Sequence, residues 1–323
     1  IYWCKGAFAE QTHELTDGST LRDRAAHIFR RRLEGGPIES LIAGGMDNPV
    51  ELAFTPLGEK FFTSTFLQHP GDGKRDGIAH AVYGSVFGKD HDVLEDLIQT
   101  GPLMPIMTHL GPAAPSGLLC LREARAQFKD QSGENILVSA QFNLHKVAAH
   151  TLIPQADASG YRTVDVDLLS SDQIDFHPTD VLEDADGSLI IVDTGGWYDL
   201  CCPTSRVDQK VAGGGIYRLR KRDSRSPSFD RIDWQEISLG RCLELLSDQR
   251  PWIRRQACFA LKRWQDQALP SMMQQILDPQ QQLQPRLDAL WGLSWVGTDQ
   301  ALATAGQLLS LPDGSIDRSA LVR

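Results

Sequence analysis

The chain has 323 residues, of which 41% are hydrophobic and 23% are charged, a balance typical of a globular protein with two or three domains. Its formal net charge of −10 disfavours a nucleic-acid-binding protein, because such proteins use a basic surface to displace counterions. No apolar stretch reaches the length of about 18 residues that a membrane-spanning helix needs.

The first residues follow the pattern of the middle of a strand, and the chain starts with Ile1 rather than Met. We therefore expect that part of the natural protein precedes Ile1. The lack of a secretion signal then says nothing about the compartment in which the protein works.

Three copies of one pattern follow along the chain. Pro49, Pro115 and Pro178 open the copies and stand 66 and 63 residues apart. Each copy continues with a short apolar strand, a turn that contains glycine, a second apolar strand and an ending in an aromatic residue. Hairpin patterns recur between the copies, clearly at 26–45 and 213–234 and more weakly at 80–98 and 144–169.

The repeating unit is therefore a set of four short strands. Such strands cannot bury their faces alone, and radial repetition solves this problem in β-propellers. We predict a partial β-propeller over 1–236, with about 3.5 blades of four antiparallel strands, as part of a larger ring. The expected blades cover about 1–47, 48–113, 114–176 and 177–236. A β-sandwich is the alternative, although it would not require such a regular period.

Residues 237–323 change to apolar side chains at helical spacing. Arg254, Arg286 and Arg318 stand 32 residues apart, each shortly after an aspartate in a predicted turn. Paired helices with an aspartate turn and an inner arginine predict a C-terminal α-helical domain of HEAT-like repeats. The third copy is incomplete, so we expect the natural chain to continue. The stripes with Met272, Met273, Trp291 and Trp295 are interpreted as core.

The six cysteines form no C-x-x-C pair, no zinc-binding spacing and no C-x-x-C-H haem-attachment site. Cys201 and Cys202 are adjacent, and neighbouring Cα atoms lie about 3.8 Å apart, below the usual disulfide span of about 4.4–6.8 Å. A disulfide between them would be strained and reducible, and it could act as a redox switch or a hydrophobic platform. Alternatively, one cysteine pairs elsewhere or both are packed thiols.

Several stretches together carry a resemblance to a family. These are "GGMDNPVELAF", "GPAAPSGL", "HPTDVLEDADGSLIIVDTGGWYDLCCPTS", "GGGIYRLRK" and the helices with regularly spaced arginines. They resemble the membrane-bound dehydrogenases of planctomycetes and related bacteria, which combine a glucose/sorbosone-dehydrogenase-like propeller with HEAT repeats and often a cytochrome c domain. The resemblance covers nearly the whole chain, and "DTGGWYDLCCPTS" is its most specific part.

The resemblance implies an extracytoplasmic quinoprotein-like sugar or alcohol dehydrogenase that is periplasmic or at the cell surface. Such an enzyme would use pyrroloquinoline quinone with Ca²⁺, and it would pass electrons to a cytochrome c that this sequence does not contain. No catalytic histidine of the family can be matched here residue by residue. The alternative from a different functional class is a non-catalytic propeller–HEAT scaffold that binds carbohydrate or protein partners, outside the cell or within it.

Loops around the central channel usually carry the function of a propeller. Asp47, Asn48, His109, His177 and Asp180 stand near the starts of the three copies, so they are candidates to bind a substrate or cofactor there. His109 is the candidate base, because an imidazole accepts a proton near neutral pH. Alternatively, these side chains only close turns and cap strand ends.

Two further positions are candidates on chemical grounds. Asp193 ends an apolar strand before two glycines, so its carboxylate could hold Ca²⁺ or could satisfy backbone donors of the loop. Arg206 follows the cysteine pair and could bind an acidic group of a ligand, or it is an exposed loop charge.

Overall fold

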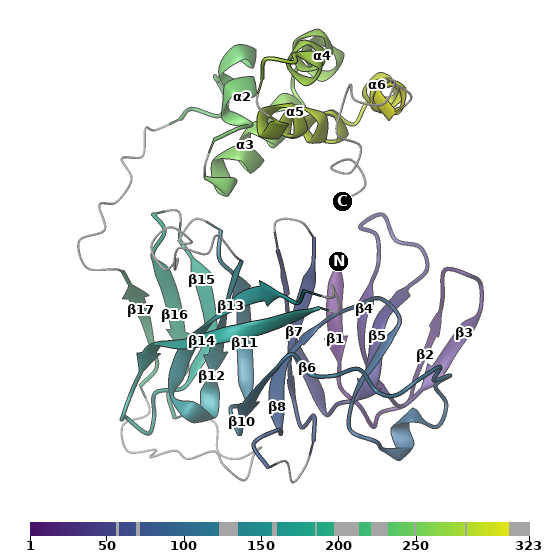
Figure 1. Ribbon diagram of the computed structural model, residues 1–323, viewed down its shortest axis with the longest axis vertical. Helices are drawn as coiled ribbons and strands as arrows, with labels where there is room; N and C mark the ends of the chain where they lie inside the picture. The colour runs from purple at the N-terminus through teal and green to yellow at the C-terminus, as the bar shows by residue number, and fades with distance from the viewer. Residues whose placement is uncertain are drawn as a thin grey trace. The chain divides into compact units, whose positions relative to one another are not determined.

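A computed structural model describes residues 1–55, 58–68, 72–122, 135–156, 160–184, 186–196, 213–220, 232–248, 250–281 and 283–309. The chain divides into two compact units (Figure 1), which we call the sheet unit, Ile1–Ser224, and the helical unit, Arg225–Arg323. None of the described helices is long and apolar enough to span a membrane.

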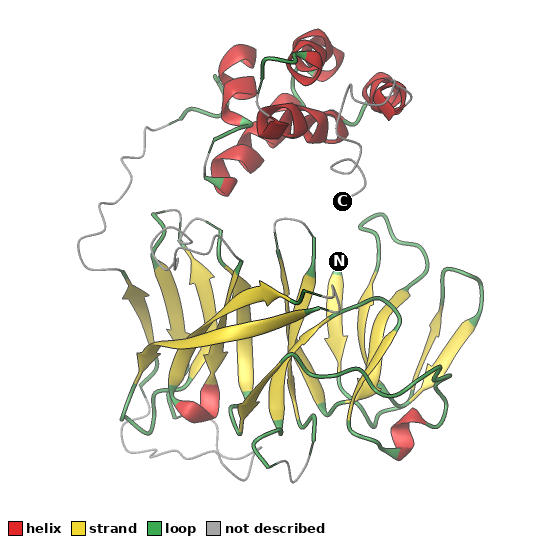
Figure 2. Ribbon diagram, in the orientation of Figure 1, coloured by secondary structure: helices red, strands yellow, loops and turns green. Residues whose placement is uncertain are grey.

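Four sheets make up most of the sheet unit, as the yellow strands in Figure 2 show. The first sheet contains, in spatial order, β1 (Tyr2–Lys5), β4 (Ala26–Arg30), β5 (Glu39–Gly45) and β9 (Ser85–Gly88). The second contains β6 (Asn48–Phe54), β7 (Lys60–Thr65), β8 (Asp76–His80) and β10 (Thr108–Gly111). The third contains β11 (Pro115–Cys120), β12 (Ile136–Gln141), β13 (Lys146–Pro154) and β14 (Tyr161–Ser170). The fourth contains β15 (Pro178–Glu183), β16 (Leu189–Asp193) and β17 (Gly215–Leu219), while β2 (Gln11–Glu14) and β3 (Thr20–Asp23) form a separate hairpin.

The three proline-led copies adopt the same pairing. Pro49, Pro115 and Pro178 are paired with Ser64, Gln141 and Asp193, the residues at or near the end of the next strand. In each pair the register shifts directly after the proline, which marks a β-bulge. The predicted repeat is therefore present as equivalent strand pairs in three successive sheets, which resemble propeller blades.

The apolar side chains lie between neighbouring sheets rather than within one common core. Phe61 and Phe62 are adjacent on β7 and both fully buried, and they point to opposite faces because side chains alternate along a strand. Phe62 packs with Ile28 of the first sheet, and Phe61 packs with Leu137 of the third. A third cluster joins the third and fourth sheets. Packing in series, each sheet against the next, is the arrangement expected of blades and differs from a two-sheet sandwich.

One strand departs from the predicted plan. The segment after β8 was expected to form a hairpin within its own copy, but β9 pairs with β5 of the preceding sheet, and it does so in parallel. Glycines permit this close approach. A Cβ at Gly45 would lie 2.1 Å from the Lys89 carbonyl oxygen, and Gly88 adopts a φ of 94°. The first two sheets are thus tied together by chain connectivity.

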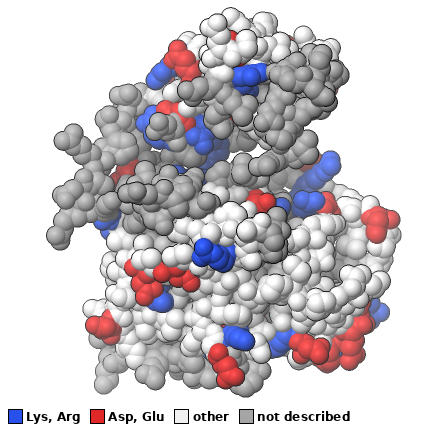
Figure 3. All heavy atoms as spheres, viewed as in Figure 1, with Lys and Arg blue, Asp and Glu red and all other residues white. Residues whose placement is uncertain are grey.

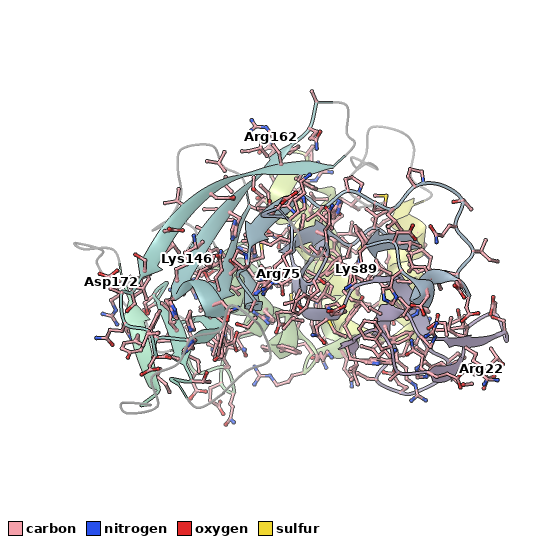
Figure 4. All side chains as sticks on the ribbon, turned by 90° about the horizontal axis from the view of Figure 1, so that it is seen from below. Arg22, Arg75, Lys89, Lys146, Arg162 and Asp172 are labelled. Atoms are coloured by element: carbon pink, nitrogen blue, oxygen red, sulfur yellow. The ribbon has the colours of Figure 1, made fainter. Side chains whose placement is uncertain are left out.

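The innermost strands of the sheets lie side by side: β6 beside β1 and β11, and β11 beside β15. Two hydrogen bonds join neighbouring sheets, the first from β7 to β11 and the second from β11 to β15. The Thr63 hydroxyl donates to the Ser116 carbonyl at 3.2 Å, and the Ser116 hydroxyl donates to the Pro178 carbonyl at 3.2 Å. Figure 4 shows the unit from below, with Arg75 and Lys89 toward its middle and Arg22 and Asp172 at its two ends.

The helical unit contains five described helices: α2 (Leu239–Leu245), α3 (Pro251–Leu261), α4 (Leu269–Leu277), α5 (Leu283–Val296) and α6 (Asp299–Leu309). α3 packs against both α2 and α5, and α5 also packs against α4 and α6. Arg254 donates to the Asp248 carbonyl at 2.6 Å and Arg286 donates to the Ile276 carbonyl at 2.8 Å, so each arginine bonds to a backbone carbonyl in or just after the preceding helix, although the two acceptors are not equivalent positions.

Two details of the helical unit differ from the sequence analysis. Ile232 and Trp234 pack on its core, so the chain divides at 224/225 rather than near residue 236. Met272 is fully buried as core, whereas Trp291 keeps 50% of its surface exposed. On the face drawn in Figure 3, Lys and Arg lie next to Asp and Glu in several places. Arg22 and Glu10 form an exposed ion pair at 3.0 Å.

Candidate functional site

Three equivalent positions on the inner strands form the candidate site. Glu51 on β6, Gly117 on β11 and Asp180 on β15 each lie two residues after the proline that opens a copy. Each lies at the register shift of its strand. Bulges bend a strand and re-aim its side chains, and they are common next to functional sites. The repeat therefore places a carboxylate, a glycine and a second carboxylate on three successive strands.

Gly117 permits the close approach of Asp180 to β11. A Cβ at this position would lie 2.7 Å from Asp180 Oδ1 and 2.7 Å from the Asp180 Cα, so any larger residue would displace the Asp180 carboxylate. The Oδ1 atom also accepts a hydrogen bond from the Val181 amide at 2.8 Å, which fixes the orientation of the carboxylate. On β6 the Glu51 amide donates to the Thr63 hydroxyl at 3.2 Å.

The two carboxylates influence each other electrostatically. Partial burial, and then the negative charge of Asp180, raise the pKa of Glu51 above its ordinary value. The Glu51 side chain remains exposed, so a ligand can reach it. A carboxylate with a raised pKa is a better proton acceptor than an ordinary one, as acid–base catalysis requires.

Cys4 on β1, which lies beside β6, is close enough to Glu51 to be affected by its charge. Burial, followed by the charge of Glu51, raises the pKa of the Cys4 thiol to about 11. Cys4 is therefore a protonated thiol at neutral pH, and it contributes an apolar wall rather than a nucleophile.

The residues predicted at the starts of the first and third copies are engaged in local contacts. Asp47 forms an ion pair with Lys89 at 2.8 Å, and Asn48 is paired with Thr65 in the ladder. His177 is fully buried, its ring centroid lies 4.3 Å from that of Phe142, and its amide donates to Asp193.

Asp193 lies where it satisfies backbone donors. One carboxylate oxygen accepts from the amides of His177 and Gly195, both at 2.8 Å, and the residue is 5% exposed. Among the described residues, no group of three or more His, Cys, Asp or Glu side chains is arranged to hold a metal ion. Ca²⁺ takes about 6–8 oxygen ligands, so the described surroundings of Asp193 do not fit this ion.

His109 lies on β10, the outermost strand of the second sheet, whereas Asp180 and Glu51 lie on inner strands. Burial, and then the charge of Lys74, lower the pKa of His109 below its ordinary value. The structure therefore does not bring His109 together with the carboxylate pair. The predicted Cys201, Cys202 and Arg206 lie outside the described residues.

Glu51 and Gly117 were missed by the sequence analysis, although a signal was present. Aligning the three copies at their prolines places Glu51, Gly117 and Asp180 in one column. These aligned positions hold two acids and one glycine within otherwise apolar strands. Such residues at equivalent positions indicate a role other than core packing.

Comparisons with known proteins show the fold only. No protein-family model and no curated protein matches the chain. Solved structures with distant similarity include a glucose-dehydrogenase-type oxidoreductase from Thermus thermophilus, with 17% identity, a TM-score of 0.39 and coverage of 58% of this chain and 49% of that one. Another is the PQQ-bound aldose sugar dehydrogenase from Streptomyces coelicolor, with 13% identity, a TM-score of 0.41 and coverage of 65% and 60%. A chain of the nidogen/laminin complex matches with 18% identity, a TM-score of 0.30 and coverage of 58% of each chain.

The chain spans 49% and 60% of the lengths of the two dehydrogenases. The chain is distantly similar to part of each of these two structures. Activity, substrate and cofactor are separate questions, since one fold serves many functions.

Proposed function

We propose that the chain binds a polyhydroxylated ligand of the sugar class between Glu51 and Asp180. The observation that carries the proposal is the pair of carboxylates on β6 and β15, on either side of β11, where Gly117 lets Asp180 lie close and the charge of Asp180 acts on Glu51. Carboxylates accept strong, charge-assisted hydrogen bonds from hydroxyl groups. A ligand with several hydroxyls relieves the repulsion between the two carboxylates without the need for a cation.

Two carboxylates are too few for an ion such as Ca²⁺, and the described residues add no third acidic, thiol or imidazole ligand. A sugar hydroxyl needs only one acceptor. The Glu51 carboxylate, with its raised pKa, would also accept a proton from a bound hydroxyl. The donor set therefore favours a neutral polyol.

The sequence resemblance extends the proposal to oxidation of the bound sugar or alcohol outside the cytoplasm, with electrons passed to a cytochrome c. Pyrroloquinoline quinone is a tricarboxylate, and the described inner strands present further carboxylates to it. Like charges in one site repel. The described residues therefore do not fit this cofactor, and we derive no step through it. The non-catalytic alternative differs only in lacking this oxidation.

Calorimetric titration of the chain with D-glucose, D-galactose and glycerol tests the proposal. We expect saturable binding of the sugars that weakens about tenfold or more in Glu51→Gln and in Asp180→Asn, because each loses charge-assisted hydrogen bonds. Asp172→Asn is the control, since Asp172 is exposed at the far end of the sheet unit. Sugar binding that is absent, or indifferent to Glu51 and Asp180, would refute the proposal.

A dye-linked oxidation assay with the same sugars, with and without added quinone and Ca²⁺, separates the two functional classes. Turnover that depends on Glu51 supports the dehydrogenase extension. Binding without turnover supports the scaffold, and it leaves the sugar site itself in place.

A further inference from the structure

The helical unit contains a groove that the sheet unit's proposed function does not use. It has a volume of 410 Å³ and lies between α2 and α4, closed at one end by the turn that leads into α5. α3 and α5 pack against each other on the other side of this helix layer. The groove is open to solvent along the two helices that border it.

Equivalent positions of the two helices line the groove. Gly240, Leu243, Glu244 and Ser247 face it from α2 and its C-terminal end, and Ser271, Gln274, Gln275 and Asp278 face it from α4. Each residue of the first set lies 31 residues before its counterpart in the second. The groove is thus a product of the repeat, formed where the same face of two successive first helices meets.

The lining has a definite chemistry. It contains two carboxylates, those of Glu244 and Asp278, and no lysine or arginine. Glu244 pairs at 2.9 Å with Arg241, but both side chains are more than half exposed, so the pair is weak and exchangeable. The charge of the groove therefore favours a cationic occupant.

The remaining polar groups of the lining can form hydrogen bonds with a peptide main chain. Gln274 and Gln281 carry primary amides that both donate and accept, as the N–H and C=O groups of an extended peptide require. The Ser247 hydroxyl is enclosed and makes no hydrogen bond to the described residues. This hydroxyl is closed off from solvent, so the glutamine amides are the groups that a peptide in the groove can reach.

We propose that this groove binds an extended peptide segment of a partner protein that carries lysine or arginine. The basic side chains lie against Glu244 and Asp278, and the peptide backbone bonds to the glutamine amides. Leu243 supplies the apolar floor for the aliphatic part of a lysine.

Gly240 offers a direct way to test the groove. A Cβ added at Gly240 meets no atom within 4 Å, so a large side chain would enter the groove without disturbing the fold. Gly306 on α6 provides a matched control, because it is also a helical glycine whose added Cβ meets no atom within 4 Å, and it does not line the groove.

The experiment titrates the full chain into the fluorescein-labelled peptide Ala-Lys-Ala-Lys-Ala at low salt and follows the fluorescence anisotropy. The ends of the peptide are blocked, so that they carry no charge of their own. We expect saturable binding that weakens about tenfold or more in Gly240→Trp and is unchanged in Gly306→Trp. Glu244→Gln and Asp278→Asn should each weaken binding about threefold, as expected for solvent-exposed charges. Added salt should weaken it further.

Three outcomes would overturn the proposal: no saturable binding, equal binding of Ala-Glu-Ala-Glu-Ala, or equal loss in Gly240→Trp and Gly306→Trp. Circular dichroism of each variant shows whether the helices remain intact. If Gly240→Trp perturbs them, Glu244→Gln and Asp278→Asn still decide the question, because both replace solvent-accessible side chains with isosteric neutral ones.

Discussion

The two units of this chain both consist of repeated elements, but they differ in how many polar side chains they bury. Among the described residues, every polar or charged residue that is almost fully buried as a whole lies in the sheet unit. The core of the helical unit is one cluster of 19 buried residues, all of them apolar or cysteine. Both units repeat, but only one of them relies on buried polar groups.

The difference follows from where backbone hydrogen bonds are made. A helix satisfies its own interior N–H and C=O groups, so its core needs only apolar side chains. A sheet that packs against other sheets must start and end strands inside the protein, and the groups exposed there need side-chain partners. Asp193 provides such a partner for His177 and Gly195.

Asp76 should be the most sensitive position. It is fully buried and accepts hydrogen bonds from the amides of Phe66 and Ala114, at 3.0 and 2.7 Å, and from Arg75 at 3.1 Å. We expect Asp76→Asn to destabilise the sheet unit by about 3–5 kcal/mol, as is typical when one partner of a buried ion pair is removed. Hydrogen exchange measured by mass spectrometry would show faster exchange across β6–β12.

Two variants, one in each unit, serve as comparisons for Asp76→Asn. Asp96→Asn replaces an exposed aspartate of the sheet unit and should have no measurable effect. Asp248→Asn removes a partner of Arg250 in the helical unit, at 2.8 Å, where both side chains reach solvent, and should cost only about 1 kcal/mol. Equal losses for Asp76→Asn and Asp248→Asn would contradict the contrast between the units.

The parallel pairing of β9 predicts the next largest effect. A Cβ at Gly45 would lie 2.1 Å from the backbone oxygen of Lys89, and no rotamer change relieves a clash with backbone. Gly45→Ala should therefore destabilise the sheet unit by about 2–3 kcal/mol. Gly101→Ala is the control, because a Cβ there meets no atom within 4 Å. Urea denaturation followed by far-UV circular dichroism measures both, and a neutral Gly45→Ala would show that β9 does not pair with β5.

A fall in pH should destabilise the sheet unit more than the helical unit, with a smaller effect than the substitutions above. Burial raises the pKa of Asp23, but hydrogen bonds from His27 and Gln11 outweigh it, so the pKa lies below its ordinary value. Hydrogen bonding to His150 likewise outweighs the burial of Asp165 and lowers its pKa. A lowered folded-state pKa gives stability that is full above about pH 4 and is lost as the pH falls through the folded pKa.

We therefore expect the sheet unit to lose stability between about pH 4 and pH 2 before the helical unit does. Tryptophan fluorescence reports mainly on the helical unit, which holds five of the seven tryptophans. Hydrogen exchange resolves the sheet strands separately. Simultaneous loss of both units at the same pH would count against this expectation, and Asp23→Asn should flatten the acid dependence of the sheet unit.

The sequence predicts what depends on local pattern. The prolines spaced by 66 and 63 residues mark equivalent strand pairs, and the two described arginines of the 32-residue spacing each bond to a backbone carbonyl in or just after the preceding helix. Alternation and helical spacing act within one element, so they can be read without knowing which elements meet.

Which strands pair with each other depends on residues that are far apart in the sequence, and the pairing of β9 was predicted wrongly. The short strand with Phe87 has an ordinary alternating pattern, and nothing in it says that it joins the preceding sheet in parallel. His109 was chosen for its chemistry, although its strand is the outermost of its sheet. Glu51 was within reach, because the column that it shares with Gly117 and Asp180 is visible once the copies are aligned.

The smallest expected effect concerns the candidate site itself. Burial and Asp180 raise the pKa of Glu51, so the folded state binds the Glu51 proton more tightly than the unfolded state does. This contribution to stability is present at low pH and is lost as the pH rises through the folded pKa.

Glu51→Gln should therefore make the sheet unit slightly more stable at pH 7, by about 0.5 kcal/mol or less because the side chain reaches solvent. The same variant should weaken sugar binding, and a residue that costs stability while it supports binding is the usual mark of a functional site. Thermal unfolding at pH 4 and pH 7 measures the effect, and a Glu51→Gln variant that is less stable at pH 7 would show that Glu51 serves the fold instead.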